Sequence, residues 1–169
     1  MPSPLLDDLC AAAADDPQWR RLLAPYDPYQ APPTSLHLAV LVEPYLTYLL
    51  DGRKTIESRF TIHPRPPYRR VLAGDLLLLK RSAGPIVGAC RAAAVWDYQL
   101  DPDSWTHIRH GFAAALCAQD GFWDERAHAA YATLIRVEQV QHLPALPLGK
   151  RDRRGWVVIA DRADTPRLL

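Results

Sequence analysis

The sequence has few cysteines and no metal-binding pattern, which excludes two classes of protein. Its three cysteines, Cys10, Cys90 and Cys117, are odd in number, widely spaced and free of any C-x-x-C pair. This spacing argues against a disulfide framework and against a zinc site, so we expect reduced thiols that are mostly buried. His107 and His110 lie three residues apart, but no further ligand accompanies them at metal spacing. The sequence therefore predicts no metal ion and no cofactor.

Long apolar runs are also missing. No segment approaches the roughly 18 apolar residues of a membrane-spanning helix. The first thirty residues carry Asp7, Asp8, Asp15 and Asp16, whereas a secretory signal has a basic start and an apolar stretch. With 49% hydrophobic and 23% charged residues among 169, the chain has enough apolar material for one compact core. We expect a cytoplasmic protein with no membrane partner.

The net charge of +1 is small but unevenly distributed. Residues 1–33 contain five Asp and two Arg, so this segment carries −3 and the remainder +4. The basic residues of the remainder gather in three places, near Arg65 to Arg70, at 80–81 and at 150–154. Such clusters, with tyrosines and tryptophans nearby, are typical of proteins with a phosphate-bearing partner. Ordinary solvated loops show the same pattern, and composition alone does not separate the two.

The order of predicted elements indicates an α+β protein. Residues 1–33 are rich in Pro, Ala and Leu and predict helices at 5–14 and 17–23, followed by a linker. Short β-rich runs at 36–42, 55–60, 76–80, 86–95, 133–140 and 156–160 predict strands, and the Ala-rich segment 103–131 predicts two helices broken at Gly121. Strands on both sides of a helical insert favour an α+β barrel over a doubly wound sheet. We divide the chain into an extension at 1–33, a domain at 34–160 and a tail at 161–169.

The segment from Gly52 to Arg59 concentrates charged side chains. It follows a predicted helix from Pro44 to Leu50, which Gly52 ends. In the next strand Glu57 and Arg59 share one face because they are two residues apart, and Lys54 lies at the turn before it. Arg59 offers a fixed fork of donors, Lys54 a point charge, and Glu57 an acceptor for an amino group. The three could line one cleft, although a surface ion-pair ladder fits the same spacing.

Gly52-x-Lys54-x-x-Glu57-x-Arg59 resembles the GxKxxExR signature of the ASCH family, and the resemblance extends over residues 36–159. It implies a PUA-like β-barrel with a helical insert, to which residues 1–33 add an N-terminal helical extension. It further implies that the cleft binds RNA, a nucleotide or a modified nucleoside, in a binding or RNA-processing role. We expect ligand contacts from Lys54, Glu57 and Arg59, with Thr55 and His63 beside them.

The resemblance leaves catalysis open. Some ASCH proteins are amidohydrolases acting on N4-acetylcytidine, and others look like ribonucleases or regulators of transcription and translation. In the amidohydrolases a threonine occupies the position of Glu57. A carboxylate near Lys54 favours the charged lysine and works against its use as a base. If the chain is an enzyme, we therefore expect a metal-independent hydrolase, with ribonuclease favoured over amidohydrolase.

A ribonuclease needs a base for the ribose 2′-hydroxyl, a cation for the developing charge and an acid for the leaving oxygen. Lys54 and Arg59 could supply the cation, and Tyr48 could approach from the preceding helix. Asp120 lies at a helix break where the family's amidohydrolases place a catalytic carboxylate. Both Tyr48 and Asp120 also have a plainer interpretation, as a packing residue and a turn residue.

A third hypothesis concerns residues 1–33. Their acidic character would let them dock onto a partner protein, or fold back on the chain's own basic face. The sequence thus leaves three alternatives: an RNA- or nucleotide-binding protein, a hydrolase, and a protein-interaction or regulatory scaffold. It indicates no particular ligand and no particular oligomeric state.

Overall fold

The computed structural model describes residues 3–149 and 153–162. Lys150 and Arg151 of the C-terminal basic run, and most of the predicted tail, lie outside the described residues. Within them, no helix combines the length and apolar character needed to cross a membrane. The helices and strands follow one another as α1 (Pro4–Ala12), α2 (Pro17–Leu23), β1 (Leu36–Leu41), α3 (Tyr45–Leu50), β2 (Ile56–Thr61), β3 (Leu76–Arg81), β4 (Ile86–Gln99), α4 (Pro102–Leu116), the 3-10 helix η1 (Asp124–Arg126), β5 (Tyr131–Leu146) and β6 (Trp156–Ala160).

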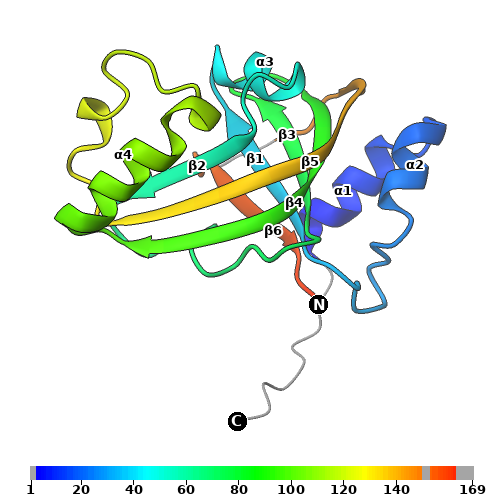
Figure 1. The fold of residues 1–169 in the computed structure, drawn as a ribbon. Helices are drawn as coiled ribbons and strands as arrows, with labels where there is room; N and C mark the ends of the chain where they lie inside the picture. Colours follow the sequence, from blue (N-terminus) through cyan, green and yellow to red (C-terminus); the bar gives the residue numbers. More distant parts are fainter. Residues whose placement is uncertain (1–2, 150–152, 163–169) are drawn as a thin grey trace, which may run out of the picture.

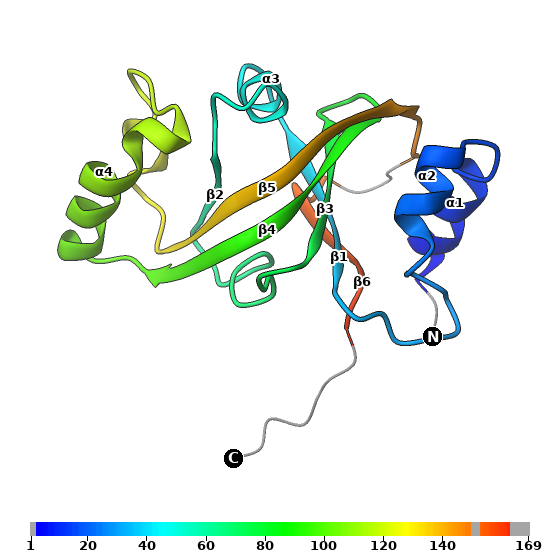
Figure 2. The ribbon, with the colours of Figure 1, turned by 45° about the vertical axis from the view of Figure 1, so that its right-hand side comes forward.

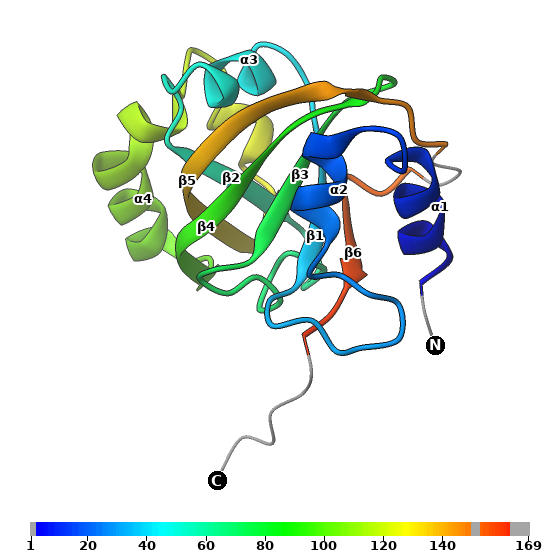
Figure 3. The same ribbon diagram turned by 90° about the vertical axis from the view of Figure 1, so that its right-hand side faces the viewer.

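The six strands form one sheet in the order β2-β5-β4-β3-β1-β6. Strands β1 and β3 run parallel, and the other neighbours run antiparallel. The sheet curls into a half-barrel whose two edges are β2 and β6 (Figures 1 and 3). Helix α4 lies at one end of the molecule and α1 and α2 at the other (Figure 2). The predicted α+β class, with strands on both sides of a helical insert, is confirmed.

Strand β3 shows why part of the sheet is apolar at every position. Successive side chains of a strand point to opposite faces. Leu77 lies inside the half-barrel against α3, whereas Leu78 lies on the outer face with Leu9 and Trp19 of the N-terminal helices. Because both faces are covered, the whole run Leu76–Leu79 is buried.

The N-terminal helices begin and end within two residues of the predicted bounds. Asp16 caps α2, since its carboxylate accepts hydrogen bonds from the backbone N–H groups of Gln18 and Trp19. The indole Nε1 of Trp19 donates to the carbonyl of Pro144 at 2.8 Å, which ties α2 to the end of β5. The extension therefore belongs to the core, and its removal would expose the outer face of β1 and β3.

The helical insert differs from the prediction of two helices, which was wrong. One helix forms, α4, capped by reciprocal hydrogen bonds between Asp101 and Ser104. Cys117 then adopts a positive φ of 53°, which ends α4, and Gly121 adopts a positive φ of 84°. The chain between them therefore does not continue as an α-helix. A loop and η1 occupy the rest of the insert, with Phe122 buried against α4 and the outer face of β2 and β5.

Strands β4 and β5 are longer than the predicted runs 86–95 and 133–140. Their pairing shifts register at three places, between Ile86 and Gly88, between Ala89 and Arg91, and between Ala92 and Ala94. Such bulges bend the pair and break the period-two pattern on which the strand prediction depends. The long, bent β4–β5 ladder is what curls the sheet.

The three cysteines are unpaired in the structure. Cys90 lies inside the half-barrel, where burial raises the pKa of its thiol to about 12. Cys10 and Cys117 are only half-buried. The expectation of a buried thiol thus holds fully for Cys90 alone.

Candidate ligand-binding site

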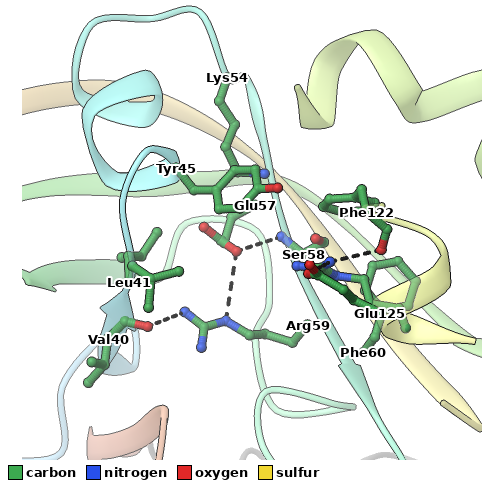
Figure 4. A pocket seen from close by; sticks show the side chains of 12 residues that line it. Val40, Leu41, Tyr45, Lys54, Glu57, Ser58, Arg59, Phe60, Phe122 and Glu125 are labelled. Atoms are coloured by element: carbon green, nitrogen blue, oxygen red, sulfur yellow. Dashed lines mark hydrogen bonds and ion pairs between the residues drawn. The ribbon is translucent and has the colours of Figure 1, made fainter. Parts of the chain in front are cut away.

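A pocket of about 370 Å³ opens beside α3, between the end of β1, strand β2 and the segment around η1 (Figure 4). All three charged residues of the signature line it. Its walls are formed by Val40, Leu41, Val42, Tyr45, Lys54, Glu57, Ser58, Arg59, Phe60, Phe122, Glu125 and Arg126.

Lys54 is fixed by a turn and by the end of a helix. Gly52 has a φ of +84°, and after this turn the backbone N–H of Lys54 donates to the carbonyl of Tyr48 at 2.9 Å. The side chain is 2% exposed, and Nζ donates to the carbonyl of Leu116 at 3.1 Å. That carbonyl belongs to the last turn of α4, where unpaired carbonyls and the helix dipole attract a cation. Nζ also lies 5.3 Å from the centre of the Tyr45 ring.

The environment of Lys54 contains opposing electrostatic effects. Burial lowers the pKa of Lys54, and this effect exceeds the attraction of Glu57, which raises it. Arg126 and Arg59 add smaller repulsions that lower the pKa further. The attraction of Glu57 that the sequence suggested is present, but desolvation of the ammonium outweighs it. Lys54 therefore loses its proton more readily than an exposed lysine.

Glu57 is buried with half of its carboxylate unused. The residue is 5% exposed, and Oε1 accepts from the backbone N–H of Ser58 at 2.8 Å. Oε1 also lies 3.7 Å from Nε of Arg59, which is too long for a hydrogen bond. Within the described residues, Oε2 of Glu57 and Nε of Arg59 are buried and have no hydrogen-bond partner. A buried polar atom without a partner costs about 1–3 kcal/mol, so such pairs call for an explanation.

Arg59 spans the gap between the two edges of the half-barrel. Its Nη2 donates to the carbonyl of Val40 at 2.9 Å (Figure 4), and its Nη1 donates to the carbonyl of Gly155, just before β6, at 3.1 Å. A Cβ at Gly155 would lie 3.0 Å from Nη1, so a glycine allows this approach. The guanidinium also lies 5.2 Å from the centre of the Trp156 ring. Burial lowers the pKa of Arg59, but an arginine keeps its charge.

The two residues considered for proton transfer lie outside the pocket lining. The guanidinium of Arg53 lies over the ring of Tyr48, 4.1 Å from the ring centre, and the hydroxyl of Tyr48 accepts a hydrogen bond from Nε2 of Gln119 at 3.3 Å. Asp120 is exposed on the loop after α4. The structure brings neither side chain to Lys54, Glu57 and Arg59.

The two flanking candidates for ligand contact also lie outside the lining. Thr55 is exposed and acts through its backbone, whose N–H donates to the carbonyl of Ala115 at 3.0 Å. His63 is exposed on the proline-rich loop after β2. Thr55 thus helps to join the signature segment to α4, next to the lysine's own contact.

The sequence does not single out several of the lining residues. Tyr45 and Tyr48 both lie on α3, and helical spacing alone does not tell which ring faces the pocket. Arg126 comes from the insert, where its guanidinium lies 3.7 Å from the centre of the Phe122 ring and donates to the carbonyl of Phe122 at 2.9 Å. The aromatic residues that line the pocket are Tyr45 on α3, Phe60 on β2 and Phe122 in the insert, and no tryptophan is among the described residues of its lining.

The donor set of the pocket suits an organic anion better than a metal ion. In the described part of the chain, no three His, Cys, Asp or Glu side chains lie close enough to form a metal site. The pocket instead combines three cationic side chains, Lys54, Arg59 and Arg126, with aromatic rings and one buried carboxylate. Such a site can bind a planar, hydrogen-bonding ligand with attached negative charge.

No family model matches the sequence, and none of the curated proteins matches it. The fold is similar to that of the ASCH protein of Zymomonas mobilis, with a TM-score of 0.54 and 12% identity over 66% of this chain and 72% of that chain. A mutant of that protein aligns with a TM-score of 0.56 and 13% identity over 73% and 87% of the two chains. The likeness concerns the fold alone, and it confirms the prediction of an α+β fold like that of ASCH proteins, here with a curled six-stranded half-barrel.

Proposed function

We propose that the chain binds RNA or a nucleotide-like ligand in the pocket lined by Lys54, Glu57 and Arg59. The observation that carries this proposal is the unpartnered pair of buried atoms, Oε2 of Glu57 and Nε of Arg59, at an open pocket. Oε2 can accept from an amino or imino group of a base, and Nε can donate to a keto or phosphate oxygen. Both atoms have almost no exposed surface, so a ligand with both groups would satisfy them once the two side chains turn toward the pocket.

The aromatic walls support a nucleobase as the ligand. The Tyr45 and Phe122 rings lie at the pocket with their centres 6.0 Å apart and an interplanar angle of 71°. RNA-binding proteins commonly stack unpaired bases on such rings and read the base edges by hydrogen bonds. Arg126, held over Phe122, adds positive charge on the same side. The ASCH-type fold is consistent with this role.

Binding of a fluorescein-labelled single-stranded RNA, followed by anisotropy, tests the proposal. A hydrogen bond to a charged group contributes about 1.5–3 kcal/mol, so Lys54→Met should weaken binding roughly ten- to a hundredfold. Arg53→Met is the matched control, because it removes one positive charge from an exposed neighbour outside the pocket. Equal affinity of wild type and Lys54→Met would refute the proposal.

The lowered pKa of Lys54 favours a second candidate function, a ribonuclease. In its neutral form the amine would take the proton of the ribose 2′-hydroxyl while the 2′-oxygen attacks phosphorus. The bond to the 5′-oxygen breaks, a cyclic phosphate forms, and the leaving oxygen takes up a proton. Arg59 or Arg126 would stabilise the negative charge that develops on phosphorus. The proton would come from the carboxyl group of Glu125, which lines the pocket and is three-quarters exposed.

This candidate requires turnover in the presence of a chelator, with a rate that rises as Lys54 loses its proton. Loss of product with Lys54→Met, alongside normal product with Arg53→Met, would support it. The same incubation with N4-acetylcytidine tests the amidohydrolase alternative. Long incubation without product from either substrate would eliminate hydrolysis and leave the binding proposal unaffected.

A further inference from the structure

A second pocket, of about 670 Å³, lies next to the first, and nearly all of its polar side chains are arginines. We call it the arginine pocket. The described residues that line it include five arginines and no Asp or Glu, and Arg59 belongs to both pockets. The five are Arg59, Arg65, Arg70, Arg153 and Arg154.

Two segments far apart in the sequence meet there. Arg65 and Arg70 belong to the loop after β2, whereas Arg153 and Arg154 precede β6. These strands are the two edges of the half-barrel. The guanidinium of Arg59, bonded to the carbonyl before β6, joins the edges at the boundary between the two pockets. The basic clusters of the sequence thus gather beside the signature residues.

Two of the five arginines have no acidic partner within residues 3–149 and 153–162. Arg70 pairs with Asp161, and Arg154 also has an interaction within the fold. Arg65 and Arg153 are exposed, and their guanidinium groups make no hydrogen bond or ion pair to any residue of the described ranges. Cationic groups concentrated in one concave surface raise the local potential and attract an anion.

The loop that carries Arg65 and Arg70 is held in place. The backbone N–H of Arg69 donates to the carboxylate of Asp97 on β4 at 3.1 Å. The ring of Tyr68 packs edge-on against Tyr131, with centres 5.0 Å apart. The arginines are therefore presented by an anchored loop, which reduces the entropy lost on binding.

We infer that the arginine pocket binds the phosphates of a single-stranded RNA whose base occupies the first pocket. The inference rests on the proposed function and deepens it, because it makes the ligand a strand of two or more nucleotides and not a free nucleoside. A guanidinium matches two oxygens of a phosphate at once, and phosphates recur at every nucleotide. Since Arg59 lines both pockets, a strand can pass from one to the other.

The test uses a fluorescein-labelled RNA hexamer of mixed sequence and measures affinity over a series of salt concentrations. The variant Arg65→Ala/Arg153→Ala removes two exposed charges from the arginine pocket. The control Arg20→Ala/Arg21→Ala removes two exposed charges from α2, at another part of the surface. Thermal unfolding of both variants verifies that the fold is intact.

We expect the Arg65→Ala/Arg153→Ala variant to bind the hexamer about tenfold more weakly at low salt. Its plot of log affinity against log salt should be shallower by about 1.4, since each phosphate contact in single-stranded RNA contributes about 0.7. The control should change neither quantity. Equal affinity and slope in the two variants would overturn the inference, as would nucleoside monophosphates that compete as strongly as the hexamer.

The same hexamer separates this inference from the proposed function. Weak binding by Lys54→Met with normal binding by Arg65→Ala/Arg153→Ala refutes the arginine pocket alone. The reverse result refutes the first pocket, and with it the continuous strand. A wild-type protein that does not bind the hexamer refutes both.

Discussion

The half-barrel holds two clusters of buried charged or polar side chains, and they differ in whether every atom has a partner. We call them the Asp75 cluster, made of Ser35, His37, Asp75, Trp156 and Arg162, and the Lys54 cluster, made of Lys54, Glu57 and Arg59. In the Asp75 cluster the carboxylate accepts from the backbone N–H groups of Ser35 and Leu72, each at 2.9 Å, and from Arg162. His37 completes the set, with Nε2 at 3.1 Å from Oδ2.

The tautomer of His37 is determined by its second contact. Nε1 of Trp156 donates to Nδ1 of His37 at 3.1 Å, so Nδ1 is the acceptor and Nε2 carries the proton that goes to Asp75. Burial raises the pKa of Asp75, but the hydrogen bonds from His37, Arg162, Leu72 and Ser35 outweigh it and lower the pKa overall. Both oxygens of the Asp75 carboxylate therefore accept hydrogen bonds from groups of the protein itself.

The Lys54 cluster shows the opposite balance. Oε2 of Glu57 and Nε of Arg59 lack hydrogen-bond partners among the described residues, and burial lowers the pKa of Lys54. In the Asp75 cluster the buried charge is stabilised by hydrogen bonds and supports the fold. In the Lys54 cluster the two atoms without hydrogen bonds lower the stability of the fold, and they lie beside an open pocket. This difference is what we expect if the first cluster has a structural role and the second has the proposed binding role.

The largest expected effect on stability comes from removing the carboxylate of the Asp75 cluster. Asp75→Ala leaves four donors without their acceptor and should lower the free energy of unfolding by about 3 kcal/mol or more. Urea denaturation measures it. Asp51→Ala, which removes an exposed carboxylate paired with Arg53, is the control and should have a much smaller effect. Equal losses in the two variants would contradict the structural role of the Asp75 cluster.

The pH dependence of the free energy of unfolding tests whether the hydrogen bonds to Asp75 stabilise the fold. Because the folded pKa of Asp75 lies below its unfolded value of about 3.9, its contribution is present above that pH and is lost as the pH falls toward the folded pKa. The free energies of unfolding of wild type and Asp75→Asn should therefore converge as the pH is lowered from about 5. Chemical denaturation at several pH values measures the gap, and a gap that stays constant would argue against the lowered pKa.

Removing the buried charge of the second cluster should have the reverse effect on stability. Lys54→Met keeps the length of the side chain and ends the desolvation of an ammonium group. We expect the free energy of unfolding to stay the same or rise by about 1 kcal/mol. Urea denaturation of this variant measures the change in stability, and the anisotropy assay measures the change in its RNA affinity. A loss above about 2 kcal/mol would mean that the lysine supports the fold.

Glu57→Gln should have the smallest effect on stability. The amide keeps the shape of the side chain, and its oxygen can still accept from the backbone N–H of Ser58. We expect a change below about 1 kcal/mol in unfolding and a clear change in which bases are bound, since the amide can donate as well as accept. Anisotropy with the four homopolymeric RNAs measures this preference, and an unaltered order of affinities would count against base contact by Glu57.

The signature segment is predictable because its interactions are local. The glycine stop at Gly52 and the two-residue spacing of Glu57 and Arg59 can be read from the sequence itself. The Asp75 cluster is not predictable in this way, because Asp75 follows Gly74 and the pair is typical of a turn. Its partner His37 lies 38 positions away and reaches it through the pairing of β1 with β3.

The arginine pocket likewise depends on tertiary structure. The clusters around Arg65 and Arg153 are visible in the sequence, but their meeting depends on β2 and β6 being the two sheet edges. The failed prediction of a second helix has the same origin, since the chain leaves helical geometry at Cys117 and Gly121 and Phe122 packs on β2 and β5. Periodicity predicts single elements well and their contacts poorly.

The most direct test follows the Nε–H group of Arg59 by ¹H–¹⁵N NMR while the RNA hexamer is added. This group lies buried beside Glu57 and has no hydrogen-bond partner among the described residues. If the pocket binds RNA, its resonance should shift and its exchange with solvent should slow as the complex forms. Saturation of the protein with RNA while this resonance keeps its position and exchange rate would contradict the assignment of the pocket.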